Sequence, residues 1–399
     1  MISSKYKSQL LDKKACLTKK LLVIPGYCNV LGGTTVSLLM LAKGFARCGL
    51  LENLCVVMHK DSFMEKYFRD AGLDNCIKLI AAANPNKFLQ KALQWVGKQP
   101  QEFPLLLDNC VWRNYLPILT LAAPSLRLSR RQIYHFCHDL ALSYNHIGYI
   151  ARKIAFASLS PGAICNSQFT AEHIRGLMPD IRGILYQPVD FEQFNPLSLN
   201  TTIPDNLQPI IDSGARIILT PSRISKPKIV NDKNLRALIP VVAHLKAMGE
   251  NYQAVIIGED KSPEMIYSRD LRERAIDAGV EDCFTILPPV VNIEDYYRHA
   301  DIVVTLAPRE PFGRTVVEAI ACGVPVVGSN TGGINEILQN FAPNWTVNPD
   351  DSVAVAKTIV NVATNSLTKE ILVKGKNWVR NQCSLENYAR SMMQLTGLF

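Results

Sequence analysis

The amino-acid sequence predicts an α/β protein built from two doubly wound, Rossmann-like domains that face each other across a cleft. With 399 residues, of which 48% are hydrophobic and 20% charged, the chain is long enough for two separate cores. Short apolar runs alternate with segments of helical period along most of the chain, which is typical of parallel βαβ units. A polar stretch with little periodicity and four prolines, residues 187–214, interrupts this alternation and predicts a linker.

The first domain is expected at residues 21–205, after a basic N-terminal extension over residues 1–20. An amphipathic helix over 35–48 joins its first two strands and ends at Gly49, a residue that favours helix termination. Six apolar runs are the expected strands: residues 21–24, 54–58, 77–80, 105–107, 133–136 and 163–165.

The second domain is expected at residues 206–378, where the alternation of strands and helices restarts. The expected strands are residues 216–220, 253–257, 284–287, 302–306 and 325–328. The expected helices are residues 234–248, 271–278, 293–299 and 314–322. Residues 379–399 follow the second domain. They have helical periodicity and are expected to form a separate C-terminal helix.

Composition excludes several classes of protein. The eleven cysteines are scattered without a Cys-x-x-Cys pair, which predicts a reduced, cytoplasmic chain without disulfides or a zinc site. No apolar run reaches the ~18 residues of a membrane span. The net charge of +8 fits phosphorylated small molecules or a membrane surface. Nucleic acid is disfavoured because no zinc finger, RNP-like motif or long basic run occurs, whereas peripheral membrane association stays open.

The loops after the strands are where ligands bind in open parallel sheets. Gly32 and Gly33 stand in the first such loop, where glycines let the backbone approach a ligand and the following helix start offers N–H groups to a phosphate or sugar oxygen. A plain tight turn is the alternative. The chain has neither Gly-x-Gly-x-x-Gly nor Gly-x-x-x-x-Gly-Lys, which disfavours an NAD-dependent oxidoreductase and a P-loop enzyme.

Two histidines, His135 and His138, lie at the end of the fifth strand, with Asp139 beside the second. A histidine at the mouth of the cleft can donate to a hydroxyl or to a departing sugar oxygen. The alternative is a packing or capping role, which is weighed more heavily for His135.

A basic loop follows the first strand of the second domain and holds Arg223, Lys226, Lys228 and Lys233. The arginine fork and the compact lysine charge together suit a diphosphate. Cations before a helix start are mildly unfavourable with the helix dipole, so an anion is expected there, although a merely solvated loop is the ordinary alternative.

The most informative stretch is PREPFGRTVVEAIACGVPVV, with Glu310 in a loop and Glu318 more than one turn into a helix. Backbone amides around Gly313, Arg314 and Thr315 are placed to bind an anion. An ionised carboxylate accepts two hydrogen bonds from a diol such as a ribose. Glu318 is flanked by apolar residues, which predicts a buried carboxylate that needs partners.

This stretch, with Glu-x7-Glu inside EPFGRTVVEAIACGVPVVGSNTGGINEIL, resembles the GT-B glycosyltransferases of family GT4, and the likeness extends through ICNSQFTAEHI and YQPVDFEQFNP. The resemblance implies a GT-B architecture with an N-terminal acceptor domain, a C-terminal donor domain and a last helix that packs back on the first. It implies a retaining hexosyltransferase that uses a UDP- or GDP-hexose.

By the same resemblance, Glu318 binds the ribose hydroxyls of the nucleotide sugar. Glu310 and the backbone from Phe312 to Thr315 hold the donor sugar and its phosphates, and Gly33 lies beneath those phosphates.

The resemblance also assigns the diphosphate contacts to Arg223 and to a lysine, for which Lys233 is preferred and Lys228 remains the alternative. His138 would lie near the sugar, from the opposite domain. Val290, in LPPVVNIEDYY, would lie against the base, where a proline replaces the family's usual glycine.

The expected chemistry is a front-face substitution, because no covalent nucleophile is evident beside the donor. Arg223, Lys233 and helix amides would stabilise the leaving diphosphate. No Asp-x-Asp occurs, so a metal-independent site without a cofactor is expected. Two alternatives stay open: a sugar-nucleotide epimerase of the same architecture, and a non-catalytic two-domain ligand-binding protein. The acceptor, whether glycan, lipid-linked or small molecule, is left undefined.

Overall fold

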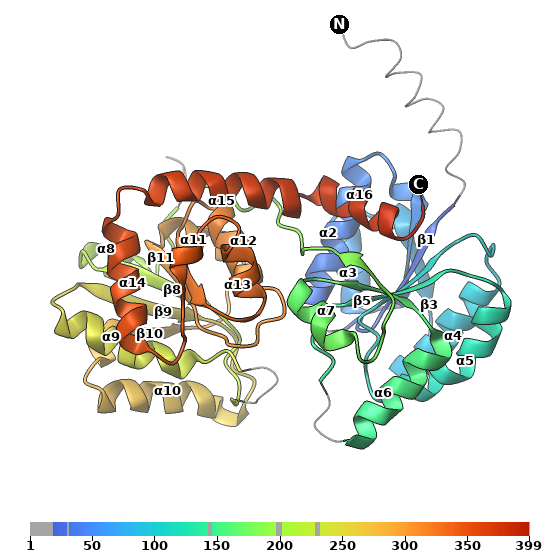
Figure 1. Cartoon of the computed structure of the whole chain (residues 1–399), viewed down its shortest axis with the longest axis horizontal. Helices are drawn as coiled ribbons and strands as arrows, with labels where there is room; N and C mark the ends of the chain where they lie inside the picture. Colours follow the sequence, from blue (N-terminus) through green and yellow to red (C-terminus); the bar gives the residue numbers. More distant parts are fainter. Residues whose placement is uncertain (1–18, 30–31, 143–145, 197–201, 228–231, 399) are drawn as a thin grey trace, which may run out of the picture. The chain divides into compact units, whose positions relative to one another are not determined.

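A computed structural model describes residues 19–29, 32–142, 146–196, 202–227 and 232–398, and these form two compact units (Figure 1). The first unit holds the described residues up to Pro188 and those from Leu385 on, and the second holds residues from Val189 to Ser384. Each unit contains one sheet in which every strand pairing is parallel. The predicted α/β class with two doubly wound sheets is therefore confirmed.

The sheet of the first unit has seven strands in the order β3-β2-β1-β4-β5-β6-β7. All six expected strands are present, and the seventh was not predicted because IRGI carries an exposed arginine and a glycine at the edge of the sheet. The strands are β1 (Leu21–Pro25), β2 (Leu54–His59), β3 (Ile77–Ile80), β4 (Leu105–Asp108), β5 (Ile133–Cys137), β6 (Gly162–Cys165) and β7 (Ile181–Ile184).

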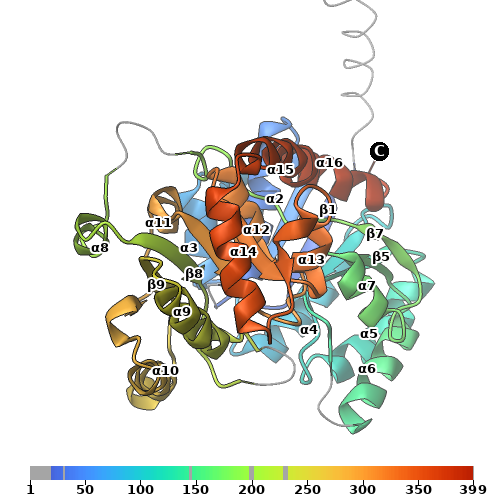
Figure 2. The ribbon, with the colours of Figure 1, turned by 60° about the vertical axis from the view of Figure 1, so that its left-hand side comes forward.

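Helices cover both faces of this sheet, and a hydrophobic core lies on each side (Figures 1 and 2). One core includes Phe45 and Phe68 and the other Phe88 and Leu119. The helices are α2 (Gly33–Arg47), α3 (Phe63–Asp70), α4 (Pro85–Gly97), α5 (Leu116–Leu128), α6 (His146–Leu159), α7 (Gln168–Ile174) and α16 (Leu385–Leu395).

The C-terminal segment, expected as one helical stretch over 379–399, is divided at Ser384, whose backbone is extended. Helix α15 (Thr368–Cys383) ends in the second unit, and α16 belongs to the first. There α16 packs against α2 so closely that a Cβ on Gly44 would lie 2.2 Å from the Leu385 carbonyl oxygen. Glycine is therefore required at this crossing of the two helices.

The sheet of the second unit has six strands in the order β10-β9-β8-β11-β12-β13. The five expected strands are present, and the two-residue β13 was too short to predict. The strands are β8 (Arg216–Pro221), β9 (Tyr252–Ile257), β10 (Phe284–Leu287), β11 (Ile302–Thr305), β12 (Val326–Ser329) and β13 (Thr346–Val347). The helices before α15 are α8 (Gln208–Asp212), α9 (Leu238–Ala247), α10 (Ile266–Asp277), α11 (Ile293–His299), α12 (Arg314–Ala321), α13 (Gly332–Leu338) and α14 (Ser352–Thr364).

The described units divide earlier than the expected boundary after residue 205. The Val189 amide donates to the Cys383 carbonyl at 2.9 Å, and the Arg380 guanidinium lies 5.1 Å from the centre of the Phe191 ring. Arg298 bonds the Gln193 carbonyl as well. The first part of the proline-bearing stretch is thus attached to the second unit by polar contacts that hydrophobic periodicity does not report.

Both sheets reverse their winding direction at one point, between β1 and β4 in the first unit and between β8 and β11 in the second. The carboxyl ends of such neighbouring strands form a crevice where ligands bind. Among the described residues, no helix is both long and apolar enough to span a membrane.

Candidate functional site

The loops after β8 and β11 bring two of the predicted site residues together. Lys233 Nζ lies 2.5 Å from Glu310 Oε2, and both side chains are largely shielded from solvent. Asn234, which follows the lysine, has a left-handed backbone with φ of 52° and donates through Nδ2 to the Leu306 carbonyl at 3.4 Å. Its amide is held by Asp232 Oδ1 at 2.8 Å. These bonds fix the backbone next to Lys233 and so orient its side chain.

Thr331 and the first turn of α13 hold the Glu310 loop in place, a role that the sequence did not suggest. Thr331 Oγ1 donates to the Pro308 carbonyl at 2.7 Å, and the Gly333 amide donates to the Glu310 carbonyl at 2.8 Å. A Cβ on Gly333 would lie 2.4 Å from the Phe312 carbonyl oxygen. The adjacent glycines of SNTGG were the available signal, because they mark a place where two backbone segments touch.

Glu318 lies within α12 and is 9% exposed. The Tyr297 hydroxyl donates to Glu318 Oε2 at 2.9 Å, and Arg314 Nη1 lies 3.9 Å from Oε1. Burial raises the pKa of the Glu318 carboxyl. The expectation of a buried carboxylate with partners is confirmed, and the fully buried Tyr297 is the partner that sequence reasoning missed.

The N-terminus of α12 adjoins the Glu310 loop. Gly313 precedes the helix with φ of 99°, in the left-handed region that favours glycine, and as the N-cap residue it has no side chain of its own to cap the helix. Phe312 is 2% exposed and anchors the turn in the core. Thr315 is half-buried in the first turn. The positive end of the helix dipole therefore lies next to the Lys233–Glu310 pair.

Arg223 is exposed on the loop that follows β8. The next residue, Ile224, forms an isolated parallel bridge with Asp260. A Cβ on Gly258 would lie 1.7 Å from the Ser222 carbonyl oxygen, so only glycine allows the two loops to pass. The position of Arg223 thus depends on Gly258, which belongs to no recognisable sequence motif.

The other predicted residues of this unit follow β8 and β10 along the chain. Lys226 is exposed on the Arg223 loop, and Lys228 lies outside the described residues. Val290 is half-buried in the loop after β10, whereas its neighbour Val291 is 93% exposed.

In the first unit, Gly32 precedes α2 with an extended backbone and Gly33 is the first residue of that helix. A Cβ on Gly32 would meet nothing within 4 Å. The described fold therefore does not itself require glycine at position 32. As at α12, the N-cap residue is a glycine, which has no side chain to cap the helix.

His138 is buried at the end of β5, and its carboxylate partner is Asp108 rather than the adjacent Asp139. His138 Nε2 lies 2.7 Å from Asp108 Oδ1, and Gln187 Nε2 lies 3.1 Å from Nδ1. With the proton on Nε2, the ring donates to Asp108 and accepts from Gln187. Both ring nitrogens are thus engaged.

His135 is a packing residue, which was the alternative to a role at the mouth of the cleft. It is completely buried, lies edge-on to Phe156 and has Nδ1 3.3 Å from Cys137 Sγ. Burial lowers the pKa of the imidazole to about 3. The ring is therefore neutral at ordinary pH.

Within the part of the chain that the structure describes, no group of three or more histidine, cysteine, aspartate or glutamate side chains could hold a metal ion.

Comparison with solved structures defines the class of protein. The crystal structure of Anabaena Alr3699/HepE in complex with UDP matches with a TM-score of 0.75 at 18% identity, covering 95% of this chain and 100% of that one. A glycosyltransferase from Rickettsia africae matches with a TM-score of 0.71 at 17% identity, over 96% and 99% of the two chains. The protein has the GT-B glycosyltransferase fold.

Sequence comparison relates part of the chain to a family of glycosyltransferases. Residues 211–377 match the model described as glycosyl transferases group 1. The D-inositol 3-phosphate glycosyltransferase of Saccharomonospora viridis is 26% identical over 202 residues, which are 49% of this chain and 45% of that protein. The lipopolysaccharide core biosynthesis mannosyltransferase LpsB of Rhizobium meliloti is 34% identical over 88 residues, 22% and 25% of the two chains. The resemblance to the GT4 glycosyltransferases is confirmed, although the chain spans less than half the length of these curated relatives.

Proposed function

We propose that this protein is a retaining glycosyltransferase that moves a hexose from a nucleoside-diphosphate sugar to an acceptor, without a metal ion. The observation that carries the proposal is the Lys233–Glu310 pair beside the start of α12, with the buried carboxylate of Glu318 one turn further along. A cation, the positive end of a helix dipole and a carboxylate together suit a diphosphate, a sugar and a ribose.

Glu318 would bind the ribose hydroxyls. Its Oε2 is held by Tyr297, and the nearest cation to Oε1 is Arg314 at 3.9 Å, which leaves acceptor capacity on the carboxylate. Because burial disfavours the ionised carboxyl, two hydroxyl donors from a ribose would stabilise it.

The chemistry would be a front-face substitution. The bond from the anomeric carbon to the diphosphate oxygen breaks as the acceptor hydroxyl attacks from the same side, and its proton passes to the departing phosphate. Lys233, Arg223 and the amides at the start of α12 would stabilise the negative charge that grows on the diphosphate. With these groups supplying the positive charge, the proposed reaction needs neither a metal ion nor another cofactor.

Glu310 would serve two functions in this reaction. It orients Lys233 through the 2.5 Å contact and offers its second oxygen to the hydroxyls of the donor sugar. The backbone from Phe312 to Thr315 would lie along the phosphates, Gly32 and Gly33 would approach them, and Val290 would lie against the base.

A direct role for His138 requires a rearrangement of its hydrogen bonds. To donate to a sugar hydroxyl, the ring would have to release Asp108, and to accept from one it would have to release Gln187. We propose that Asp108 keeps the proton on Nε2 and that the Gln187 contact is the one exchanged for substrate.

UDP-hexoses are the first donors to test, because UDP and UDP-glucose occupy the Anabaena Alr3699/HepE crystal structures. We expect UDP, and not ADP or CMP, to raise the melting temperature of the protein, since a ligand that binds only the folded state stabilises it by mass action. GDP is the alternative base.

Glu318→Ala should abolish this stabilisation, whereas Glu273→Gln, on the exposed surface of α10, should leave it unchanged. A melting temperature that no nucleotide changes would contradict the proposal. Conversion of a nucleotide sugar to its epimer without an acceptor would instead favour the epimerase alternative.

We further propose that the first unit binds peripherally to an anionic membrane surface on the cytoplasmic side. Helices α5 and α6 pack side by side (Figure 1). Each presents apolar side chains to solvent. On α6, Ile147, Ile150 and Ile154 share one face and are 71%, 54% and 54% exposed; on α5, Leu121 and Leu128 are 81% and 84% exposed.

The charges on these two helices favour anionic lipid. Arg127 on α5 and Lys153 on α6 are exposed, Arg130 follows α5, and neither helix contains an acidic residue. An exposed apolar stripe flanked by basic side chains is the pattern of helices that lie in a membrane interface.

Vesicle co-sedimentation tests this surface. We expect binding to vesicles with 30% phosphatidylglycerol but not to phosphatidylcholine alone, and its loss in Ile150→Asp/Ile154→Asp. Ile276→Asp, at an equally exposed position of α10, is the matched control and should bind as wild type does. Equal binding to both kinds of vesicle, or an unaffected double variant, would refute the assignment.

A further inference from the structure

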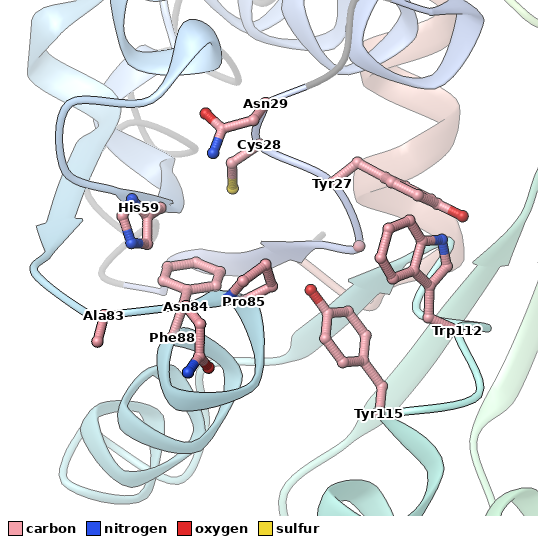
Figure 3. Close-up of a pocket in the computed structure, with 11 residues that line it drawn as sticks. Tyr27, Cys28, Asn29, His59, Ala83, Asn84, Pro85, Phe88, Trp112 and Tyr115 are labelled. Atoms are coloured by element: carbon pink, nitrogen blue, oxygen red, sulfur yellow. The ribbon is translucent and has the colours of Figure 1, made fainter.

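A pocket opens at the carboxyl ends of β1, β2, β3 and β4, at the point where the first sheet reverses its winding (Figure 3). Its cavity volume is about 190 Å³, which is below the ~300 Å³ at which sites for drug-sized ligands begin. The lining residues are Gly26, Tyr27, Cys28, Asn29, His59, Ala83, Asn84, Pro85, Phe88, Trp112 and Tyr115. None of the predicted site residues lies among them.

Five of the eleven residues that line the pocket carry an aromatic ring. Tyr27 and Trp112 meet edge to face with their ring centres 4.6 Å apart, and Tyr115 lies 6.0 Å from Trp112. On the other side His59 packs edge-on against the buried Phe88. Trp112 is 39% exposed, an unusual cost for so large an apolar side chain. A ligand that covered its ring would recover that cost.

The polar groups of the pocket include no lysine, arginine, aspartate or glutamate, and some of their donors are unused. Tyr115 is 3% exposed, yet its hydroxyl bonds no described residue, and Figure 3 shows the oxygen directed into the pocket. Asn29 Oδ1 accepts from the Phe63 amide at 3.1 Å, which leaves its NH₂ group as a donor. Asn84 Oδ1 likewise accepts from the Lys87 amide at 2.9 Å.

The pocket is unsuited to an anion. None of its described lining residues carries a lysine or arginine side chain. At the start of α4, which borders it, Pro85 has no N–H and the Lys87 amide already donates to Asn84 Oδ1, so fewer helix amides are available to an anion. Burial raises the pKa of the Cys28 thiol to about 11 and that of the Tyr27 hydroxyl to about 12, as expected where charged forms are poorly solvated.

We propose that this pocket binds the acceptor, and that the acceptor enters it as an uncharged saccharide ring. A pyranose offers an apolar C–H face to aromatic rings such as Tyr27 and Trp112, and hydroxyls at its rim to the Tyr115 oxygen and the asparagine amides. The pocket thereby differs from what the names of the inositol-phosphate relatives suggest, since a phosphate here would lose its hydration without meeting a cation. Treating the ligand as the acceptor rests on the proposed function.

Binding is tested with the whole chain, using methyl α-D-glucopyranoside, methyl α-D-mannopyranoside and glucose 6-phosphate as probes. Ligand-observed NMR should detect the two methyl glycosides and give glucose 6-phosphate at least tenfold weaker binding. Trp112→Ala should weaken glycoside binding by about tenfold and Tyr115→Phe by about fivefold, as expected for losing an aromatic contact and one hydrogen bond. Tyr67→Phe, on α3 and outside the pocket, should leave it unchanged.

The response of the melting temperature to UDP, measured on the same samples, separates this proposal from the proposed function. If UDP stabilises the protein but neither glycoside binds, or if glucose 6-phosphate binds as well as they do, the pocket assignment is overturned. If Trp112→Ala and Tyr115→Phe bind the glycosides as wild type does, it is overturned too. If UDP has no effect while the glycosides bind through Trp112, the pocket stands and the proposed function falls.

Discussion

The two units share one architectural plan but surround their strand ends with opposite chemistry. The second unit gathers charge there, with the Lys233–Glu310 pair, an exposed Arg223 and the buried carboxylate of Glu318. The first unit gathers aromatic rings and neutral amides around a pocket without lysine or arginine. A doubly wound sheet thus fixes where a ligand can bind, and the loop side chains decide whether it is ionic or neutral.

The largest expected effect tests the charged half of this comparison at Glu318. We expect Glu318→Gln to weaken UDP binding by about 10³-fold, because two hydrogen bonds to an ionised group are lost. Burial raises the pKa of this carboxyl, so its ionised form lowers stability above the ordinary carboxyl range. The neutral variant should therefore keep or exceed the wild-type melting temperature at pH 7.

Calorimetric titration with UDP and thermal unfolding of the same preparation check this prediction. A variant that binds UDP normally would remove Glu318 from the site. Tyr297→Phe is the companion, since it deletes only the hydroxyl that holds Glu318 Oε2. It should weaken UDP binding less than Glu318→Gln does.

The charged site was predictable from the sequence because its residues lie in few loops with distinctive spacing. Glu310 and Glu318 stand eight positions apart around one turn, and the structure confirms one in a loop and the other buried in a helix. What the sequence could not show is the contact of Lys233 with Glu310 across 77 positions, or the hydroxyl of Tyr297 on Glu318. Such pairings depend on which strands are neighbours in the sheet.

The pocket of the first unit was not predictable, for a physical reason. Its rings come from four separate segments of the chain, and each, such as Tyr27 or Trp112, is read in isolation as an ordinary core aromatic. The fold itself was largely predicted because apolar runs report burial directly. The sequence did not predict β7, which is only partly buried, the two-residue β13, or the division of the last segment at Ser384.

The second prediction concerns how the free energy of unfolding depends on pH. It uses His135, a buried base, as the counterpart of the buried acid Glu318. Its imidazole pKa, about 3 in the folded protein, lies below the ordinary 6.5, so the unfolded chain binds the extra proton between these pH values. Stability should therefore fall as pH drops below 6.5, by about 3 kcal/mol between pH 7 and pH 4 from this group. Urea unfolding at several pH values, with His135→Gln as comparison, measures the slope. An equal slope in the variant would exclude His135 as the cause.

The third prediction tests whether the Lys233–Glu310 pair is functional or merely structural. We expect Lys233→Met to slow UDP-glucose hydrolysis by about 10²-fold, the usual cost of losing one preorganised charge stabiliser. Glu310→Gln should also slow it, and the double variant should lose less than the product of the single effects, because the two groups act as a unit. Steady-state hydrolysis rates of the wild type, the two single variants and the double variant complete this double-mutant cycle. Independent effects of the two variants would show that the contact between them has no catalytic role.

The fourth prediction compares a glycine that the second unit requires with one that the first does not. Gly258→Ala should lower the free energy of unfolding by about 2 kcal/mol, because the new Cβ overlaps the Ser222 carbonyl and the backbone must move. It should also weaken UDP binding by displacing Arg223. Gly97, in α4, has open space around its Cβ, so Gly97→Ala should be neutral or stabilising. Denaturant titrations compare the two, and equal effects would refute the close approach at Gly258.

The smallest expected effect separates the two sites by ionic strength. Arg223 and Lys226 are exposed, so their attraction to a diphosphate is screened as salt is added. Raising NaCl from 50 to 500 mM should weaken UDP binding by about two- to fivefold, the strength typical of exposed ion pairs. Methyl glycoside binding should change by less than this, because stacking on Trp112 and hydrogen bonding to Tyr115 involve no net charge. The same salt series followed by calorimetry for UDP and by NMR for the glycoside gives both slopes. Parallel slopes would mean that charge reaches the aromatic pocket after all, and that the chemical contrast between the two units does not extend to the ligands they bind.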